Sequence, residues 1–113
     1  MDVGELFWAD LPTTDGHEQS GRRPVMVIQD DGYAGQLPTV LIVPLTSTRA
    51  AARFPGTVLI PATPANGLAA DSVLLIFQVR ALDRTRFGRR IGVAEPAILT
   101  QVYQTLDQLT GHP

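Results

Sequence analysis

The chain has 113 residues, of which 44% are hydrophobic and 18% charged, and it contains no cysteine. This size and composition predict one soluble globular domain over residues 1–113, and they exclude disulfides, thiolate metal sites and a disordered chain. No apolar run approaches the roughly 18 to 20 residues that cross a bilayer, and the start lacks the basic and apolar regions of a secretory signal. We therefore expect a cytoplasmic protein without membrane association.

The net charge of −2 hides a strong polarisation along the chain. Residues 1–45 carry seven acidic residues against two arginines, whereas residues 46–92 carry seven arginines against two acidic residues. All nine basic residues are arginines. A GC-rich genome enriches arginine, but the planar guanidinium also binds phosphate through paired hydrogen bonds, so the bias favours phosphate recognition as well.

The first half of the chain predicts three strands, at 4–10, 24–29 and 39–45, because these runs are rich in β-branched and aromatic residues. The run PVMVIQ at 24–29 is almost continuously apolar, which predicts burial on both faces. Residues 30–36 are expected to form a turn. Pro44 predicts that the third strand lies at an edge or ends there.

The second half predicts strands at 57–60 and 72–79, with a loop at 47–56 and an arginine-rich turn region at 82–90. Residues 91–93 are expected to form a short sixth strand. Apolar residues then recur at three- and four-residue steps in the final segment, which predicts one helix between a proline near its start and a glycine at its end: Pro96, Ile98, Leu99, Val102, Leu106, Leu109 and Gly111. The expected fold is mainly β, a small barrel-like sheet covered by a C-terminal helix.

Residues 16–24 read GHEQSGRRP and place an acid, an imidazole and two cations between two strands. PLTST at 44–48 adds hydroxyl groups at the end of a neighbouring strand. The sequence has only two histidines and lacks the metal-binding, nucleotide-binding and nucleophile-elbow motifs, so we expect chemistry that needs no metal and no cofactor. RNA cleavage suits these groups, because RNA carries its own nucleophile beside its phosphate and needs only proton transfer and charge neutralisation.

Taken in order, GELFWADL, GHEQSGRRPVMVI, VPLTS, DSVLLIFQVRALD and the closing helix resemble the MazF/PemK family of toxin endoribonucleases, over almost the whole chain. The resemblance implies a small SH3-like, partly open β-barrel of the CcdB/PemK type with a C-terminal helix, usually as a homodimer. It implies sequence-specific, metal-independent cleavage of single-stranded RNA by the 2′-hydroxyl, which leaves 2′,3′-cyclic phosphate and 5′-hydroxyl ends. The implied partner is an antitoxin whose disordered, often acidic tail covers the RNA groove.

The resemblance also assigns residues to the site. Arg23 matches the family's catalytic arginine and Thr46 its catalytic threonine, while Glu18 and Gln19 match the acid and amide of its loop. For the base we favour Glu18, with His17 as a second candidate. The residues expected to contact RNA are Gln19, Ser47 and Gln78, with Arg80 and Arg86 as members of a basic field along the second half of the chain.

The chain departs from the family at Phe77, which stands where many members have an acid. This departure keeps two other functions open. One is a non-catalytic RNA-binding regulator, and the other is a toxin of the same fold that poisons DNA gyrase through its C-terminal helix. Phe7 and Trp8 are expected in the core, with base stacking as the alternative for Trp8.

Overall fold

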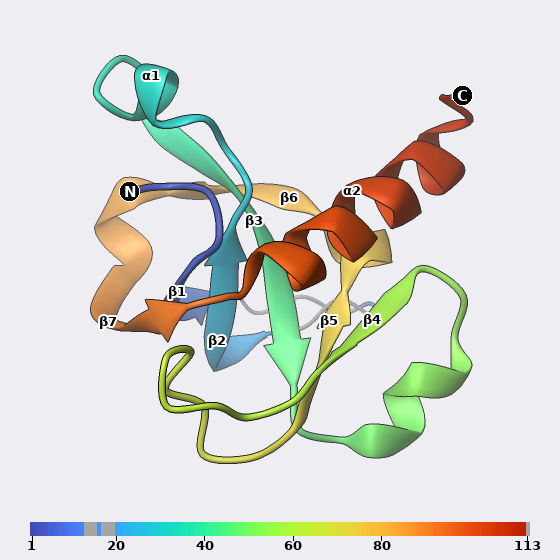
Figure 1. Ribbon diagram of the computed structural model, residues 1–113. Helices are drawn as coiled ribbons and strands as arrows, with labels where there is room; N and C mark the ends of the chain where they lie inside the picture. The colour runs from blue at the N-terminus through green and yellow to red at the C-terminus, as the bar shows by residue number, and fades with distance from the viewer. Residues whose placement is uncertain (13–15, 17–19, 113) are drawn as a thin grey trace.

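The computed structural model of the chain describes residues 1–12, 16 and 20–112, which form an open, antiparallel and strongly curved sheet with a helix lying across it (Figure 1). The strands are β1 (Glu5–Leu11), β2 (Gly21–Val27), β3 (Thr39–Thr46), β4 (Thr57–Ile60), β5 (Ser72–Leu75), β6 (Arg80–Asp83) and β7 (Phe87–Val93). Their order in the sheet is β4-β5-β3-β2-β1-β7, and β6 pairs with β3 beside this path. The expected mainly β, barrel-like fold is confirmed.

The helices are α1 (Asp31–Ala34), a single turn, and α2 (Pro96–Thr110), with short 3-10 turns η1 (Arg49–Arg53), η2 (Ile76–Gln78) and η3 (Arg84–Arg86). Helix α2 has Pro96 in its first turn and ends at Gly111, whose φ of 72° suits glycine, as the sequence predicts. The apolar face of α2 packs over β4 and η2. No helix among the described residues is long and apolar enough to span a membrane.

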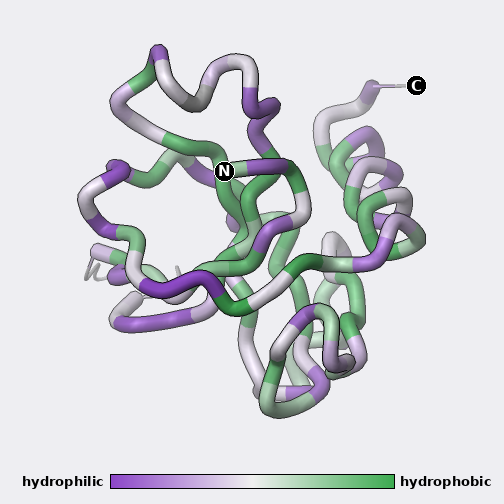
Figure 2. The backbone as a smooth tube through the Cα atoms, turned by 60° about the vertical axis from the view of Figure 1, so that its left-hand side comes forward, coloured by the Kyte–Doolittle hydropathy of each residue, from purple (hydrophilic) through white to green (hydrophobic). Residues whose placement is uncertain are grey.

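Two apolar clusters fill the molecule, and β2 contributes to both. Met26 lies in the cluster beneath α2, whereas Val25 and Val27 lie in the cluster between the strands β1, β2, β3 and β6. All three side chains are fully buried, which confirms the burial of this run on both faces. Figure 2 shows the same arrangement, with hydrophobic stretches along the crossing strands and hydrophilic ones on the outer connections.

Strand β3 has neighbours on both sides, so the prediction that Pro44 marks an edge or a strand end is wrong. On one side β3 pairs with β2 through Pro44. On the other side it pairs with β6 as far as Ile42 and with β5 from Leu45. Pro44 therefore lies where β3 exchanges one partner for another, and a residue without a backbone N–H is tolerated at such an interruption.

Several local predictions need correction. The segment 72–79 is extended only to Leu75 and then turns through η2, the turn at 30–36 contains α1, and the loop at 47–56 contains η1. The arginine-rich region at 82–90 contains the end of β6, all of η3 and the start of β7 rather than a turn alone. Seven strands form instead of five or six, because β6 forms where no strand was expected. Strand β7 begins at Phe87 rather than at 91, and its bulges break the period-two pattern by which strands are recognised.

The connection between β4 and β5 is held tightly against β7. Asn66 is fully buried, and its side chain accepts hydrogen bonds from the backbone N–H groups of Thr63 and Leu68 and donates one to the Pro61 carbonyl. The backbone of this connection approaches β7 so closely that a Cβ atom on Gly92 would lie 2.5 Å from the Ala65 carbonyl oxygen. Glycine on β7 thus permits the contact that fixes this connection.

We predict that Gly92→Ala destabilises the protein by roughly 1–3 kcal/mol, because the added methyl group would force two backbone segments apart. Urea denaturation measures the change. The matched control is Gly35→Ala, since a Cβ on Gly35 meets nothing within 4 Å and its φ of −86° suits any residue. Equal stability of the two variants would contradict the tight packing of the connection on β7.

Candidate functional site

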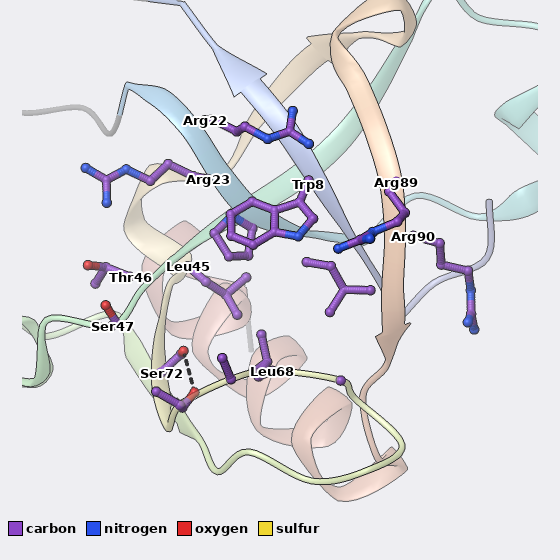
Figure 3. A pocket seen from close by; sticks show the side chains of 15 residues that line it. Trp8, Arg22, Arg23, Leu45, Thr46, Ser47, Leu68, Ser72, Arg89 and Arg90 are labelled. Atoms are coloured by element: carbon purple, nitrogen blue, oxygen red, sulfur yellow. Dashed lines mark hydrogen bonds between the residues drawn. The ribbon is translucent and has the colours of Figure 1, made fainter.

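A cleft of about 590 Å³ lies where β1, β2 and β7 face the end of β3 and the segment 67–72 (Figure 3). Four arginines line it, Arg22, Arg23, Arg89 and Arg90. Thr46, Ser47 and Ser72 add hydroxyl groups. Apolar surface comes from Trp8, Pro24, Leu45, Leu68 and Ile91. This combination of cations, hydroxyls and apolar surface fits a polyanion that also carries flat apolar groups.

The divergence of β2 and β3 brings Arg23 and Thr46 to the same cleft. The two strands pair antiparallel with Val25 opposite Pro44 and Val27 opposite Ile42. Continued in this register, Arg23 would stand opposite Thr46, but the pairing of β2 with β3 ends at Val25 and Pro44, while β3 pairs with β5 along its other side. The strand ends separate, and the two side chains line the space between them (Figure 3).

Arg23 is exposed, and its Nε donates a hydrogen bond to the Ser20 carbonyl oxygen at 3.2 Å. This bond restrains one edge of the guanidinium. The terminal nitrogens form the other edge, which suits bidentate binding of two phosphate oxygens.

Thr46 is buried, with 5% of its surface exposed, although it lines the cleft. Its Oγ1 accepts a hydrogen bond from the backbone N–H of Thr48 at 3.2 Å. A hydroxyl group that accepts one bond can still donate another, so the Thr46 proton remains available to an oxygen in the cleft.

Bulges in β7 direct three consecutive residues to the cleft. The pairing of β1 with β7 matches Leu6 with Gly92 and Ala9 with Phe87, so three steps on β1 face five on β7. In a regular strand neighbouring side chains point to opposite faces, yet residues 89–91 all line the cleft. In Figure 3, Arg89 extends toward the middle of the cleft and Arg90 extends away from it.

Arg90 is held by Glu5, whose carboxylate lies 2.5 Å from the Arg90 Nε. The pKa of Glu5 is lowered, chiefly by the hydrogen bond from the Asp2 backbone N–H and next by the hydrogen bond from Arg90. Arg22 has a looser partner, since Asp10 Oδ1 lies 3.7 Å away and both side chains are exposed. Two of the four arginines of the cleft therefore have carboxylate partners.

None of the described residues that line the cleft is an aspartate, glutamate or histidine. The candidate base Glu18, its alternative His17 and the expected RNA contact Gln19 lie outside the described residues. Their roles stay predictions. Within the described part of the chain, no three aspartate, glutamate or histidine side chains lie together as a metal site would require.

Three other expected RNA contacts do not line the cleft. Gln78 ends η2, Arg80 begins β6 and Arg86 ends η3, and these three stay predictions as RNA contacts. Phe77 also lies away from the cleft. It is 42% exposed, and its ring centroid lies 6.0 Å from that of Phe54.

Trp8, Arg89 and Arg90 line the cleft, although Trp8 was expected there only as the alternative to a core position and Arg89 and Arg90 were not singled out as site residues. Trp8 belongs to neither apolar cluster and lines the cleft beneath Arg22, so the prediction that it lies in the core is wrong. Phe7 packs against one of the clusters and against the ring of Phe87. In the period-two pattern of residues 5–11, Leu6 and Trp8 alternate with Phe7 and so share one face of β1. The pattern does not separate the two side chains, because it does not show the curvature of β1 that moves Trp8 out from beneath α2, where Leu6 packs.

We predict that Glu5→Gln lowers the free energy of unfolding by about 1 kcal/mol at pH 7, because it removes the charge that Arg90 and the Asp2 N–H stabilise. A lowered carboxyl pKa adds stability that is complete above its ordinary value of 4.5 and is lost as the pH falls through the folded value. The difference from wild type should therefore shrink below pH 4.5. Denaturation from pH 7 to pH 3 tests this, and a constant difference would contradict it.

The comparisons with known proteins agree with this geometry. Residues 2–110 match the family model of the PemK-like, MazF-like toxins of type II toxin–antitoxin systems. The endoribonuclease MazF6 of Mycobacterium tuberculosis H37Rv is 38% identical over 99 residues, 87% of this chain and 86% of the relative.

Two crystal structures from Deinococcus radiodurans are similar throughout. MazF is 33% identical with a TM-score of 0.84, covering 98% of this chain and 96% of that one. MazF in the MazE–MazF structure is 32% identical with a TM-score of 0.79, covering 100% and 97%. The resemblance predicted from the motifs is thus confirmed, and the chain belongs to the PemK-like, MazF-like toxins of type II toxin–antitoxin systems.

Proposed function

We propose that this toxin cleaves single-stranded RNA in the arginine-lined cleft, without a metal ion. The observation that carries the proposal is the meeting of Arg23 and Thr46, from two diverging strands, in one cationic cleft. Membership of a family with endoribonuclease relatives supports it.

The reaction needs three events. The 2′-hydroxyl loses its proton and its oxygen attacks the adjacent phosphorus, the bond from phosphorus to the 5′-oxygen breaks, and that oxygen takes a proton. The products are a 2′,3′-cyclic phosphate and a 5′-hydroxyl. Because negative charge grows on the phosphoryl oxygens, fixed hydrogen-bond donors beside them lower the barrier.

Arg23 is the donor we assign to the phosphoryl oxygens, since its Nε already binds the Ser20 carbonyl and its terminal nitrogens form the opposite edge. Thr46 orients the scissile phosphate through its hydroxyl proton, while Thr48 N–H holds its oxygen. Ser47 lies next to it at the cleft.

Proton transfer from the 2′-hydroxyl is assigned to Glu18, or alternatively His17, because the described cleft lining offers no acid and no imidazole. In the sequence, Glu18 stands five positions and His17 six positions before Arg23. Gln19 is assigned to RNA binding in the same segment. Phe77 has no ionisable group, so the base in this chain is not the residue at position 77.

A direct test maps the products of cleavage. Purified toxin is incubated with a long RNA of mixed sequence in excess EDTA. The new ends of the RNA fragments are then sequenced, and the chemical group on each end is identified. We expect cuts at a defined short sequence, with cyclic phosphate and 5′-hydroxyl ends, and the same rate without chelator. RNA binding without any cut would support the non-catalytic regulator instead, and loss of activity in EDTA would contradict the metal-free mechanism.

In the same assay, Arg23→Ala should lower kcat by at least about a hundredfold, the scale seen for loss of one preorganised donor to a developing oxyanion. The fold should survive, since Arg23 is exposed. Arg49→Ala is the matched control, because Arg49 is an exposed arginine on η1 that does not line the cleft, and it should lower the rate less than tenfold. A folded Arg23→Ala variant with full activity would remove the central assignment.

The partner is the cognate antitoxin of a toxin–antitoxin pair, and the pair acts in the cytoplasm, where RNA is available. The antitoxin tail is assigned to the cleft, because an acidic segment would meet four arginines there. The similar MazF was crystallised with MazE, which supports a stable complex.

We also propose that the toxin is a homodimer whose interface includes an apolar patch formed by Phe54, Phe77 and Leu109. These side chains are 42–47% exposed, and they gather around Gly56, where a Cβ atom would lie 3.2 Å from atoms of both Phe77 and Leu109. Contiguous exposed apolar surface of this kind is typical of a surface that another protein covers. A second copy is the occupant that the family resemblance implies.

We predict that Phe54→Ser combined with Leu109→Ser shifts the toxin from dimer to monomer without unfolding it. Sedimentation velocity at micromolar concentration measures the change. Leu59→Ser is the control, since Leu59 is 54% exposed on β4 and should leave the dimer intact. A monomeric wild type, or an unchanged dimer in the double variant, would exclude this interface.

A further inference from the structure

We propose that the indole of Trp8 is a stacking platform for one nucleobase of the bound RNA, next to the scissile phosphate. This inference rests on the proposed RNA cleavage and names a binding residue and a base-binding position for it. Neither the mechanism above nor the charge of the cleft requires an aromatic residue there.

Trp8 is positioned to meet a base of the bound strand. It stands on β1 opposite Pro24 of β2, and both side chains line the cleft. Figure 3 shows the indole in the middle of the cleft, with Arg23 and Thr46 toward one end and Arg89 toward the other. A backbone that runs from Arg23 toward Arg89 would therefore carry a base over Trp8.

Trp8 does not pack as a core residue. Its strand neighbours Leu6 and Ala9 are fully buried and each belongs to an apolar cluster, but Trp8 is only partly buried and belongs to neither. Large aromatic side chains that stay at a polar cleft are typical of surfaces that bind single-stranded bases.

A cation accompanies the ring. The guanidinium carbon of Arg22 lies 5.6 Å from the centre of the indole. Asp10 lies 3.7 Å from Arg22, and Gly88 leaves space for it, because a Cβ atom there would lie 3.3 Å from Arg22 Nη2. An aromatic face beside a cation binds a base by stacking while the cation attracts the adjoining phosphate.

The opposite wall of the cleft suits a flat ligand. It is formed by Leu68, Ala69 and Ala70, which are apolar or small and follow the Asn66 contacts that hold this segment in place. In Figure 3, Leu68 lies across the cleft from Trp8. The two walls thus present apolar surface to the two faces of one base.

Trp8 is the only tryptophan in the chain, so its fluorescence reports this contact alone. The probe is an all-2′-deoxy version of the mapped cleavage site, which binds but lacks the attacking hydroxyl. We expect the single strand to quench Trp8 fluorescence and the same strand in a duplex to quench it far less. An abasic residue at one position should remove the quenching and weaken binding about tenfold.

Variants separate stacking from folding. Trp8→Leu should raise KM for RNA about tenfold and relax the base preference at that one position, with a smaller change in kcat, whereas Trp8→Phe should restore most of the affinity. Tyr103→Leu is the control, because Tyr103 is a half-exposed aromatic residue on α2 away from the cleft. Circular dichroism checks that each variant is folded.

The outcomes distinguish this inference from the function beneath it. Binding of the single strand without quenching would overturn the stacking platform, as would a folded Trp8→Leu variant with unchanged KM and unchanged cleavage sites. Both results leave RNA cleavage intact. A wild-type protein that cuts no RNA would overturn the proposed function instead.

Discussion

The cleft depends on where the pairing of β2 with β3 ends. The two strands are paired only as far as Val25 and Pro44; beyond that point β2 continues along β1 to Gly21, and β3 continues along β5, on its other side, to Thr46. The interruption accommodates a residue that cannot donate a backbone hydrogen bond. At the level of Arg23 and Thr46 the two strands are no longer paired, and side chains fill the space between them. The arginine and the hydroxyl group therefore line one cleft.

The far side of the cleft has a different origin. Bulges in β7 bring residues 89–91 into the lining of the cleft, and the connection that carries Leu68 is fixed on β7 by buried Asn66 and by the close approach at Gly92. A site on strands and on a hydrogen-bonded connection keeps its donors in place before the substrate binds. Such preorganisation is what electrostatic stabilisation of a transition state requires.

The sequence predicted the elements whose pattern is local. The doubly buried run at 24–29 and the helix between Pro96 and Gly111 follow from periodicity and end signals alone. The place of Pro44 did not follow, because its tolerance depends on which strands flank β3. The cleft roles of Trp8 and Arg89 did not follow either, since curvature and bulges, which have no simple sequence signal, decide where those side chains point.

The charges of the cleft indicate which groups the substrate would meet first. Glu5 holds Arg90 and Asp10 accompanies Arg22, whereas no ion pair between described residues involves Arg23 or Arg89. These two cations stand toward opposite ends of the cleft in Figure 3, with Trp8 between them. A strand of RNA would supply anions for both and a flat group between them. The described lining holds no aspartate, glutamate or histidine that could take the 2′-proton, and Phe77 lies in an apolar patch away from it, which is why we assign proton transfer to the segment that leads into Arg23.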